Sequence, residues 1–117
     1  MNNLAISYKM DEYADLEGAV KQGNLVISYA DLVALMGEPN FESMDRNKVR
    51  AEWRLSIDGE GAAIYDWKTN GVPLADVDVW NFGTRTLSVA CAVCRIISEG
   101  VKPSIKPIER SQDDDQE

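Results

Sequence analysis

Histidine is absent from this chain of 117 residues, which also contains only two cysteines and four prolines. Without an imidazole the chain cannot form a Ser-His-Asp or Cys-His pair, a histidine metal site or the usual acid–base catalyst of neutral pH. No apolar run approaches the roughly 20 residues that a membrane-spanning helix needs. The start, Met1-Asn2-Asn3, lacks the basic residues and the apolar run of a secretory signal. We therefore expect a cytoplasmic protein with no membrane partner.

Basic residues are also scarce, with 12 against 20 acidic residues and a formal net charge of −8. A chain with this balance is repelled by phosphate groups, so we expect no direct nucleic-acid partner. Four of the acids lie in the last seven residues, and we expect residues 101–117 to form a disordered acidic tail. Residues 1–24 are polar, and residues 25–100 hold most of the apolar residues that can fill one core.

Three segments carry helical signals. The spacing i, i+3 and i+7 of Tyr13, Leu16 and Val20 predicts a short helix over about residues 11–21. A second helix is predicted over residues 29–36, because Ser28 is a favourable N-cap and Gly37 a favourable stop. The longest pattern predicts a helix over residues 85–99, capped by Thr84 and ended by Gly100. Its broad apolar stripe indicates burial against a sheet.

Alternation of apolar and polar residues predicts the strands. Every second residue is apolar over 48–57, a turn follows at 58–61, and a return strand ends at 68, so we expect an antiparallel hairpin. Residues 76–82 alternate again and predict a third strand, whereas residues 25–27 form only a short extended piece. The expected fold class is α+β, with an antiparallel sheet of about three strands and helices packed on one face.

The two cysteines, Cys91 and Cys94, have the C-x-x-C spacing. We interpret them as small buried residues on the apolar stripe of the last helix. Redox pairs of this spacing lie at a helix N-terminus, and a zinc site needs two further ligands that no other cysteine and no histidine supplies. The alternative is a metal or redox site that bridges two copies of the chain. Otherwise we expect no cofactor.

Three aspartates form a candidate metal cluster. Asp76 and Asp78 flank Val77 and would share one face of the third strand, where Asp66 could join them to hold Mg²⁺ or Ca²⁺. The simpler interpretation is that they are solvated acids on an edge strand, which discourage pairing between sheets. The cluster is the basis of an alternative function, a metal-dependent hydrolase.

Aromatic residues are concentrated in the predicted sheet: Trp53, Tyr65, Trp67, Trp80 and Phe82. Such a group can stack nucleobases, or it can fill the core between the sheet and the last helix. We favour core packing, with one exposed tryptophan at a partner surface as the exception.

Charged residues supply the candidate partner contacts. The acids at the N-terminus form the first group, because they could imitate phosphates in a basic groove, although a run of charges is usually solvated surface. Two aspartates near the predicted third strand come next in order of preference. The polar face of the first hairpin strand is a second candidate surface. The residues are Asp11, Glu12, Asp15 and Glu17, then Asp76 and Asp78, and finally Arg50, Glu52 and Arg54.

Several short motifs resemble those of a group of small, mostly uncharacterised proteins encoded in phages and prophages. They are Tyr29-Ala30-Asp31-Leu32, Met36-Gly37-Glu38-Pro39, Ala51-Glu52-Trp53, Ala63-Ile64-Tyr65-Asp66-Trp67-Lys68 and Trp80-Asn81-Phe82-Gly83, within residues 25–98. Thr84 stands where the relatives often have a second glycine. The helix–Gly-x-Pro–hairpin unit is also similar to the repeat of β-lactamase-inhibitor-like proteins, which implies helices on one face of an antiparallel sheet. Neither resemblance supplies catalytic residues.

The resemblance to phage proteins implies an accessory protein that acts in the host cell. Small acidic proteins of this kind often bind a host machine, CRISPR nuclease complexes among them. We therefore expect a non-enzymatic inhibitor, for example an anti-CRISPR protein, that contacts a host or defence-system protein or nucleoprotein complex. It would be a monomer or a homodimer. The further alternative is a self-assembling phage protein that dimerises through its sheet edge or its last helix.

Overall fold

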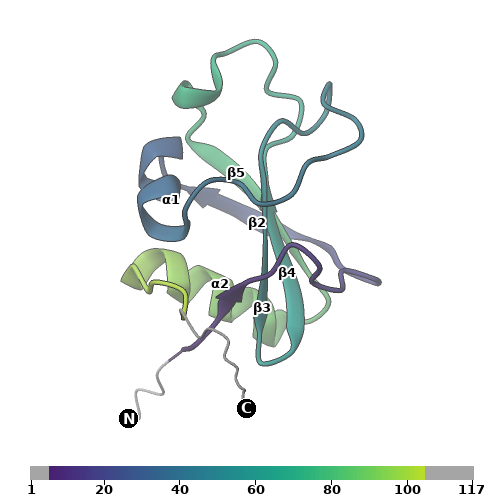
Figure 1. Ribbon diagram of the computed structural model, residues 1–117, viewed down its shortest axis with the longest axis vertical. Coiled ribbons are helices and arrows are strands. Elements are labelled where there is room, and N and C mark those ends of the chain that lie inside the picture. Colours follow the sequence, from purple (N-terminus) through teal and green to yellow (C-terminus); the bar gives the residue numbers. More distant parts are fainter. Residues whose placement is uncertain (1–5, 105–117) are drawn as a thin grey trace, which may run out of the picture.

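The computed structural model describes residues 6–104, which form a five-stranded antiparallel sheet and two α-helices. The strands are β1 (Lys9–Met10), β2 (Val20–Val26), β3 (Glu52–Ile57), β4 (Glu60–Tyr65) and β5 (Val79–Thr84), in the order β1-β3-β4-β5-β2. The helices are α1 (Tyr29–Met36) and α2 (Leu87–Glu99), and both lie on the same side of the sheet (Figure 1). The expected mixture of helices and antiparallel sheet is confirmed. The count of three strands is wrong, because the N-terminal segment adds β1 and most of β2.

The predicted antiparallel hairpin is confirmed, but β3 begins at Glu52 and not at Lys48, β4 ends at Tyr65 and not at Lys68, and the turn is tighter than expected. Ile57 pairs with Glu60, so only Asp58 and Gly59 remain in the turn. Both turn residues have positive φ, 51° and 82°, which is typical of a type I′ turn. An Asp-Gly pair favours this turn because its twist matches that of the strands. Glu60 and Gly61, which we predicted in the turn, therefore open β4.

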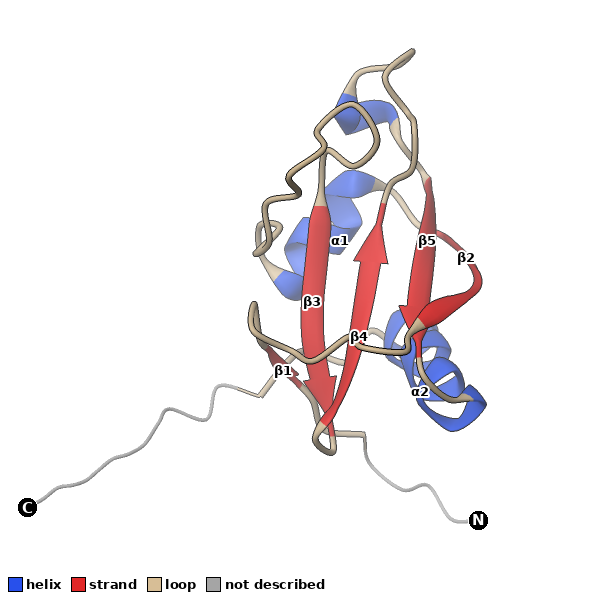
Figure 2. Ribbon diagram, turned by 90° about the vertical axis from the view of Figure 1, so that its right-hand side faces the viewer, coloured by secondary structure: helices blue, strands red, loops and turns tan. Residues whose placement is uncertain are grey.

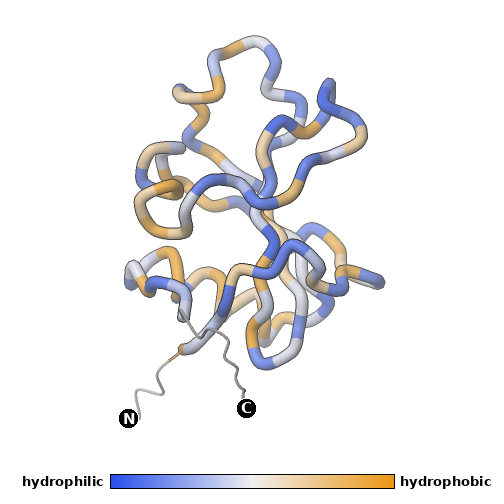
Figure 3. Tube along the Cα trace, viewed as in Figure 1, coloured by the Kyte–Doolittle hydropathy of each residue, from blue (hydrophilic) through white to orange (hydrophobic). Residues whose placement is uncertain are grey.

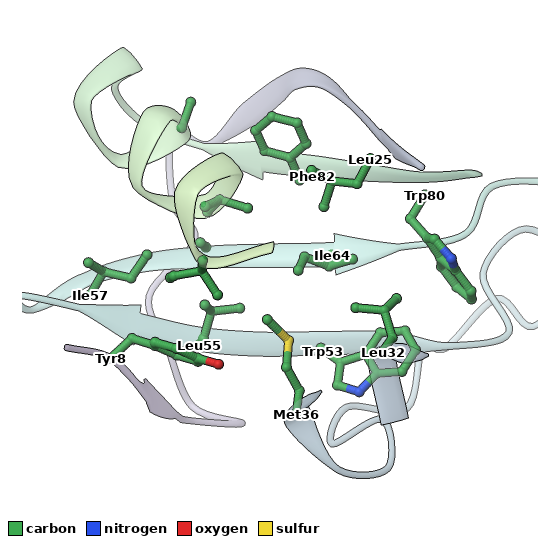
Figure 4. Packing of buried hydrophobic residues seen from close by; sticks show 14 of the residues in the cluster. Tyr8, Leu25, Leu32, Met36, Trp53, Leu55, Ile57, Ile64, Trp80 and Phe82 are labelled. Atoms are coloured by element: carbon green, nitrogen blue, oxygen red, sulfur yellow. The ribbon is translucent and has the colours of Figure 1, made fainter. Parts of the chain in front are cut away.

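The core lies between the sheet and the two helices. Alternate residues of β3, namely Trp53, Leu55 and Ile57, point toward the helices together with Ile64 of β4 (Figure 4). The helices cover these side chains with α1 residues Leu32 and Met36 and α2 residues Val89, Val93 and Ile96. The period-two pattern read from the sequence is thus the pattern of burial in β3.

Two tryptophans pack together at the α1 end of the core, where both rings also contact Tyr29 (Figure 4). Trp53 and Trp80 are completely buried and meet edge to face, with ring centroids 5.2 Å apart. The indole N–H of Trp53 donates to the carbonyl of Gly37, and that of Trp80 donates to the carbonyl of Ile27. Each indole N–H is therefore hydrogen-bonded although the whole ring is buried away from water.

The helix ends follow local signals. α1 has the predicted bounds, and the Ser28 side chain accepts from the backbone N–H of Asp31. α2 begins two residues later than predicted, because Thr86 caps it by accepting from the N–H of Val89. Thr84, the predicted cap, is buried at the end of β5. Gly100 ends α2 in the left-handed conformation, as expected. Neither helix in residues 6–104 has the length and apolarity to cross a membrane.

The predicted helix over residues 11–21 is wrong. Residues 11–19, here called the strap, form an irregular segment that crosses the outer face of the sheet, the face away from the helices (Figure 2). The Asp11 carboxylate accepts from the N–H of Tyr13, and the Asp15 carboxylate accepts from the N–H of Glu17. Such side-chain-to-backbone bonds compete with a helix, and Gly18 adopts a φ of 82° that ends any helical path.

The third predicted strand is displaced along the chain. Residues 74–76 form a 3₁₀ turn and the strand itself, β5, spans residues 79–84. Beyond Gly100, residues 101–104 pack beside β1, because the Tyr8 hydroxyl donates to the Val101 carbonyl and the Ser104 N–H donates to the Tyr8 carbonyl. The rest of the predicted acidic tail, residues 105–117, lies outside the described residues.

Candidate functional site

The strap is held tightly against the outer face of the sheet. A Cβ at Gly61 of β4 would overlap the backbone carbonyl of Asp15, so the strap backbone lies directly on the strand. Ala14 is buried and Leu16 is partly buried beside the same face. Only a glycine permits this close approach of two backbones. The strap is thereby fixed on one side while its other side faces solvent.

The exposed side of the strap is acidic and carries one aromatic ring. Glu12, Asp15 and Glu17 are exposed, and Asp11 is partly so, which brings the four predicted acids onto one ordered segment. Tyr13 is 85% exposed among them. Figure 3 shows this mixture of hydrophilic and hydrophobic residues along the strap. The helical spacing had placed Tyr13 on the apolar face of the predicted helix over residues 11–21, so its exposure was not expected.

Only one arginine pairs with the strap's carboxylates in the described part of the chain. Arg85 lies 3.9 Å from the Asp15 carboxylate and 3.7 Å from that of Glu60. Both pairs are long and exposed, and such pairs contribute little to stability. The charge of the strap is therefore largely available to a partner.

A small pocket opens beside the strap. It has a volume of about 240 Å³, below the usual 300–1,000 Å³ of sites for drug-sized ligands, and matches a single side chain better. The strap and the segment before β3 both contribute to its lining. The lining includes Leu16, Ala19, Val49, Glu52, Ala63 and Tyr65. Burial, and secondarily the charge of Glu52, raises the pKa of Tyr65 above its ordinary value.

The second candidate surface is not a free polar face. Glu52 is 8% exposed, and its carboxylate accepts from Nε of Arg54 at 2.7 Å. The Arg54 guanidinium lies over the ring of Phe41, 3.3 Å from the centroid. Arg50 donates to the carbonyls of Thr69 and Val72 and to the Thr69 hydroxyl. These three charged side chains are occupied by internal contacts, so they expose little charge to a partner.

The candidate metal cluster, the alternative interpretation of these aspartates, does not form. Asp66 is completely buried, and its carboxylate accepts from the N–H groups of Arg50 and Ala51 at 2.7 and 2.9 Å and from the Thr69 hydroxyl. Asp76 ends the 3₁₀ turn and Asp78 precedes β5; both are exposed, but neither is on an edge strand. Within residues 6–104, no three carboxylate or thiol groups are arranged to hold a metal ion. Asp66 instead pins the loop after β4 to the segment before β3.

The loop after β4, which Asp66 joins to the segment before β3, contains an exposed tryptophan. Trp67 is 48% exposed, and the ammonium groups of Lys48 and Lys68 lie 6.0 and 5.5 Å from its ring centroid. The N–H of Lys68 donates to the carbonyl of Lys48 at 2.7 Å, which joins the two segments. The expected core packing is confirmed for Trp53, Trp80 and Phe82, whereas Tyr65 lines the pocket beside the strap. That the exposed tryptophan contacts a partner stays a prediction. Val49, next to Lys48, lines the pocket beside the strap.

Both cysteines were predicted to be buried, and that prediction is wrong. Cys91 and Cys94 are free thiols on the exposed side of α2. The helix turns Val89, Val93 and Ile96 toward the sheet instead. Because α2 is apolar around most of its circumference, the sequence pattern does not define which stripe is buried. Packing of the β-branched side chains on the sheet decides the rotation of the helix.

These features define a small α+β protein with an ordered acidic strap on the outer face of its sheet, a small pocket beside the strap, and an exposed tryptophan near two lysines in the loop after β4. Comparison of the chain with protein-family models, with curated proteins and with solved structures finds no match.

Proposed function

We propose that this protein is a phage-encoded, non-enzymatic inhibitor that binds a host or defence-system complex, such as a CRISPR nuclease complex, in the host cytoplasm. The observation that carries the proposal is the strap, an acidic segment that is ordered by its own turns and exposes a tyrosine. The phage origin and the type of partner rest on the sequence resemblance.

Order in the free protein favours binding by the strap. Association costs free energy when loops and side chains must be immobilised, and preorganisation lowers that cost. The Asp11 and Asp15 turns and the contact with Gly61 already fix the strap backbone. The strap can therefore act as a rigid surface.

Charge and aromatic character indicate the chemistry of the partner. The four acids of the strap attract a basic groove, which accelerates association and makes it sensitive to salt. Tyrosine is enriched among the residues that dominate binding energy at interfaces, because it buries a large ring and keeps a polar end. Tyr13 is thus the central contact of the proposal, and the acids surround it as nucleic-acid mimics.

Neutralisation of the strap tests the proposal. The variant Asp11→Asn, Glu12→Gln, Asp15→Asn, Glu17→Gln removes four charges and keeps a carbonyl oxygen at positions 11 and 15 to accept the turn bonds. A matched control, Asp31→Asn, Glu38→Gln, Glu42→Gln, Asp58→Asn, removes the same number of charges from exposed residues that lie outside the strap and outside the other candidate contacts. Each protein is expressed in a CRISPR-immune host, tested for restoration of phage plating, and purified with its bound host proteins.

We expect the wild type and the control to restore plating and to retain the same host complex. We expect the strap variant to lose at least about tenfold in affinity, which corresponds to roughly 1.4 kcal/mol. If the wild type neither restores plating nor retains a host protein, the proposed function is wrong. If both variants lose binding equally, net charge and not the strap carries the interaction.

A further inference from the structure

We propose that Cys91 and Cys94 form a thiolate site for Zn²⁺ that two copies of this chain share. Both thiols are free and exposed, and neither belongs to the buried face of α2. Cys91 also borders a surface hollow that Ile57 and Asp58 help to line. Residues three apart on a helix are neighbours, with Cβ atoms about 5–6 Å apart. The two sulfur atoms can therefore approach one ion from the same helix face.

The ligand chemistry of the pair fits zinc, and one chain cannot complete the site. Zinc binds cysteine sulfur at about 2.3 Å, usually with four tetrahedral ligands, and C-x-x-C is a common spacing for two of them. The sequence has no further cysteine and no histidine. Within residues 6–104, no third acidic side chain lies near the thiols to form a metal-binding group. The missing pair of ligands is therefore the same cysteine pair of a second copy.

The surface around the thiols fits a second copy of α2. Leu87 is 73% exposed and lies one turn before Cys91 on the same face. Leu87, Cys91 and Cys94 are spaced i, i+4 and i+7, which is the spacing of the seam between two paired helices. The only charged residues of α2, Arg95 and Glu99, are paired with each other at 2.9 Å. The helix is thus neutral in a protein with a net charge of −8, so two copies can meet here without strong local repulsion.

Binding requires no oxidant. Each of four thiols gives up one proton, and one Zn²⁺ forms four Zn–S bonds between the two copies. The complex carries a net local charge of −2, and the four protons go to solvent. Binding is therefore expected to weaken as the pH falls, because protons compete with zinc for sulfur. The inference does not depend on the strap or on its partner.

The test is a titration of the full-length protein with Zn²⁺ in a phosphine reductant, which keeps the thiols free without adding a competing thiol. Native mass spectrometry and sedimentation report metal stoichiometry and assembly, and Co²⁺ reports tetrahedral thiolate coordination by its visible absorption. We expect one metal ion per two chains and a dimer that a chelator dissociates. Cys91→Ser and Cys94→Ser should each lose both signals, whereas Ser98→Ala, an exposed position on the same helix, should keep them.

Four results would overturn the inference. The first is a monomer that binds no zinc at micromolar concentrations, and the second is a monomer that binds one ion per chain. The third is zinc binding that persists when Cys91→Ser and Cys94→Ser are combined in one chain, which would place the ion on carboxylates. A dimer that forms only without reductant and without metal would also contradict it, because that dimer would be a disulfide.

Discussion

Gly61 lies directly beneath the backbone carbonyl of Asp15, so closely that a Cβ on the glycine would overlap the carbonyl oxygen. The two residues are 46 positions apart in the sequence. Their contact fixes the acidic strap on the sheet, and it therefore links the stability of the fold to the geometry of the proposed binding surface.

Gly61→Ala should displace the strap. We expect the free energy of unfolding to fall by about 1–3 kcal/mol, because overpacking forces backbone shifts, and partner binding to weaken with it. Urea unfolding and limited proteolysis within the strap measure the two effects. Gly71→Ala is the matched control, since nothing lies within 4 Å of a Cβ there and its φ is not positive. Equal stability of the two variants would contradict the proposed contact.

Asp66→Ala should be strongly destabilising. The substitution leaves the N–H groups of Arg50 and Ala51 without their acceptor and removes the nearest carboxylate from the Arg50 side chain. Loss of such a buried acceptor costs about 3 kcal/mol or more. Asp78→Ala, at an exposed position, should change the free energy of unfolding by less than about 0.5 kcal/mol. Chemical denaturation of both variants checks the difference, and similar values would show that Asp66 has no structural role.

Trp67 should dominate the quenching of tryptophan fluorescence by iodide. The ring is 48% exposed and two lysines beside it attract the anion, whereas Trp53 and Trp80 are completely buried. Trp67→Phe should abolish most of the quenching and leave the melting temperature nearly unchanged. Trp53→Phe should keep the quenching but lower stability by about 1–3 kcal/mol, because it removes buried area and the hydrogen bond to Gly37. Persistent quenching in Trp67→Phe would mean that a core tryptophan is accessible.

Tyr8 should make the fold sensitive to alkaline pH. Burial raises the pKa of Tyr8 to about 12, and its hydroxyl donates to the Val101 carbonyl at 2.6 Å. The unfolded chain loses this proton near pH 10, so the stabilisation is complete below about pH 10 and is lost as the pH rises toward 12. The loss should be on the order of 2 kcal/mol.

Tyr8→Phe should remove this component of the pH dependence. The variant is expected to be about 1 kcal/mol less stable at pH 7, because the hydrogen bond is gone. The difference between the two proteins should shrink and reverse between pH 10 and 12. Thermal unfolding across this range measures it, and parallel stability curves would contradict the assignment.

Much of the local structure could be predicted from the sequence. Ser28 and Gly37 define α1, and the alternation over β3 identifies its buried face, because caps and strand periodicity are properties of neighbouring residues. The four acids of the strap were also identified as candidates. Their common surface was not, since the same segment has helical periodicity, and Tyr13 was assigned to a helix face that does not exist.

By itself, then, the sequence determined α1, the hairpin, the helical nature of α2 and the absence of histidine chemistry, because each depends on composition or on residues within a few turns of one another. Tertiary structure alone decided the strap, the two edge strands and the exposure of the cysteines. Val20 pairs with Thr84, and Lys9 pairs with Ser56. Such pairings join distant parts of the chain, and their free energy overrides a local helical pattern whenever the sheet gains more than the helix would.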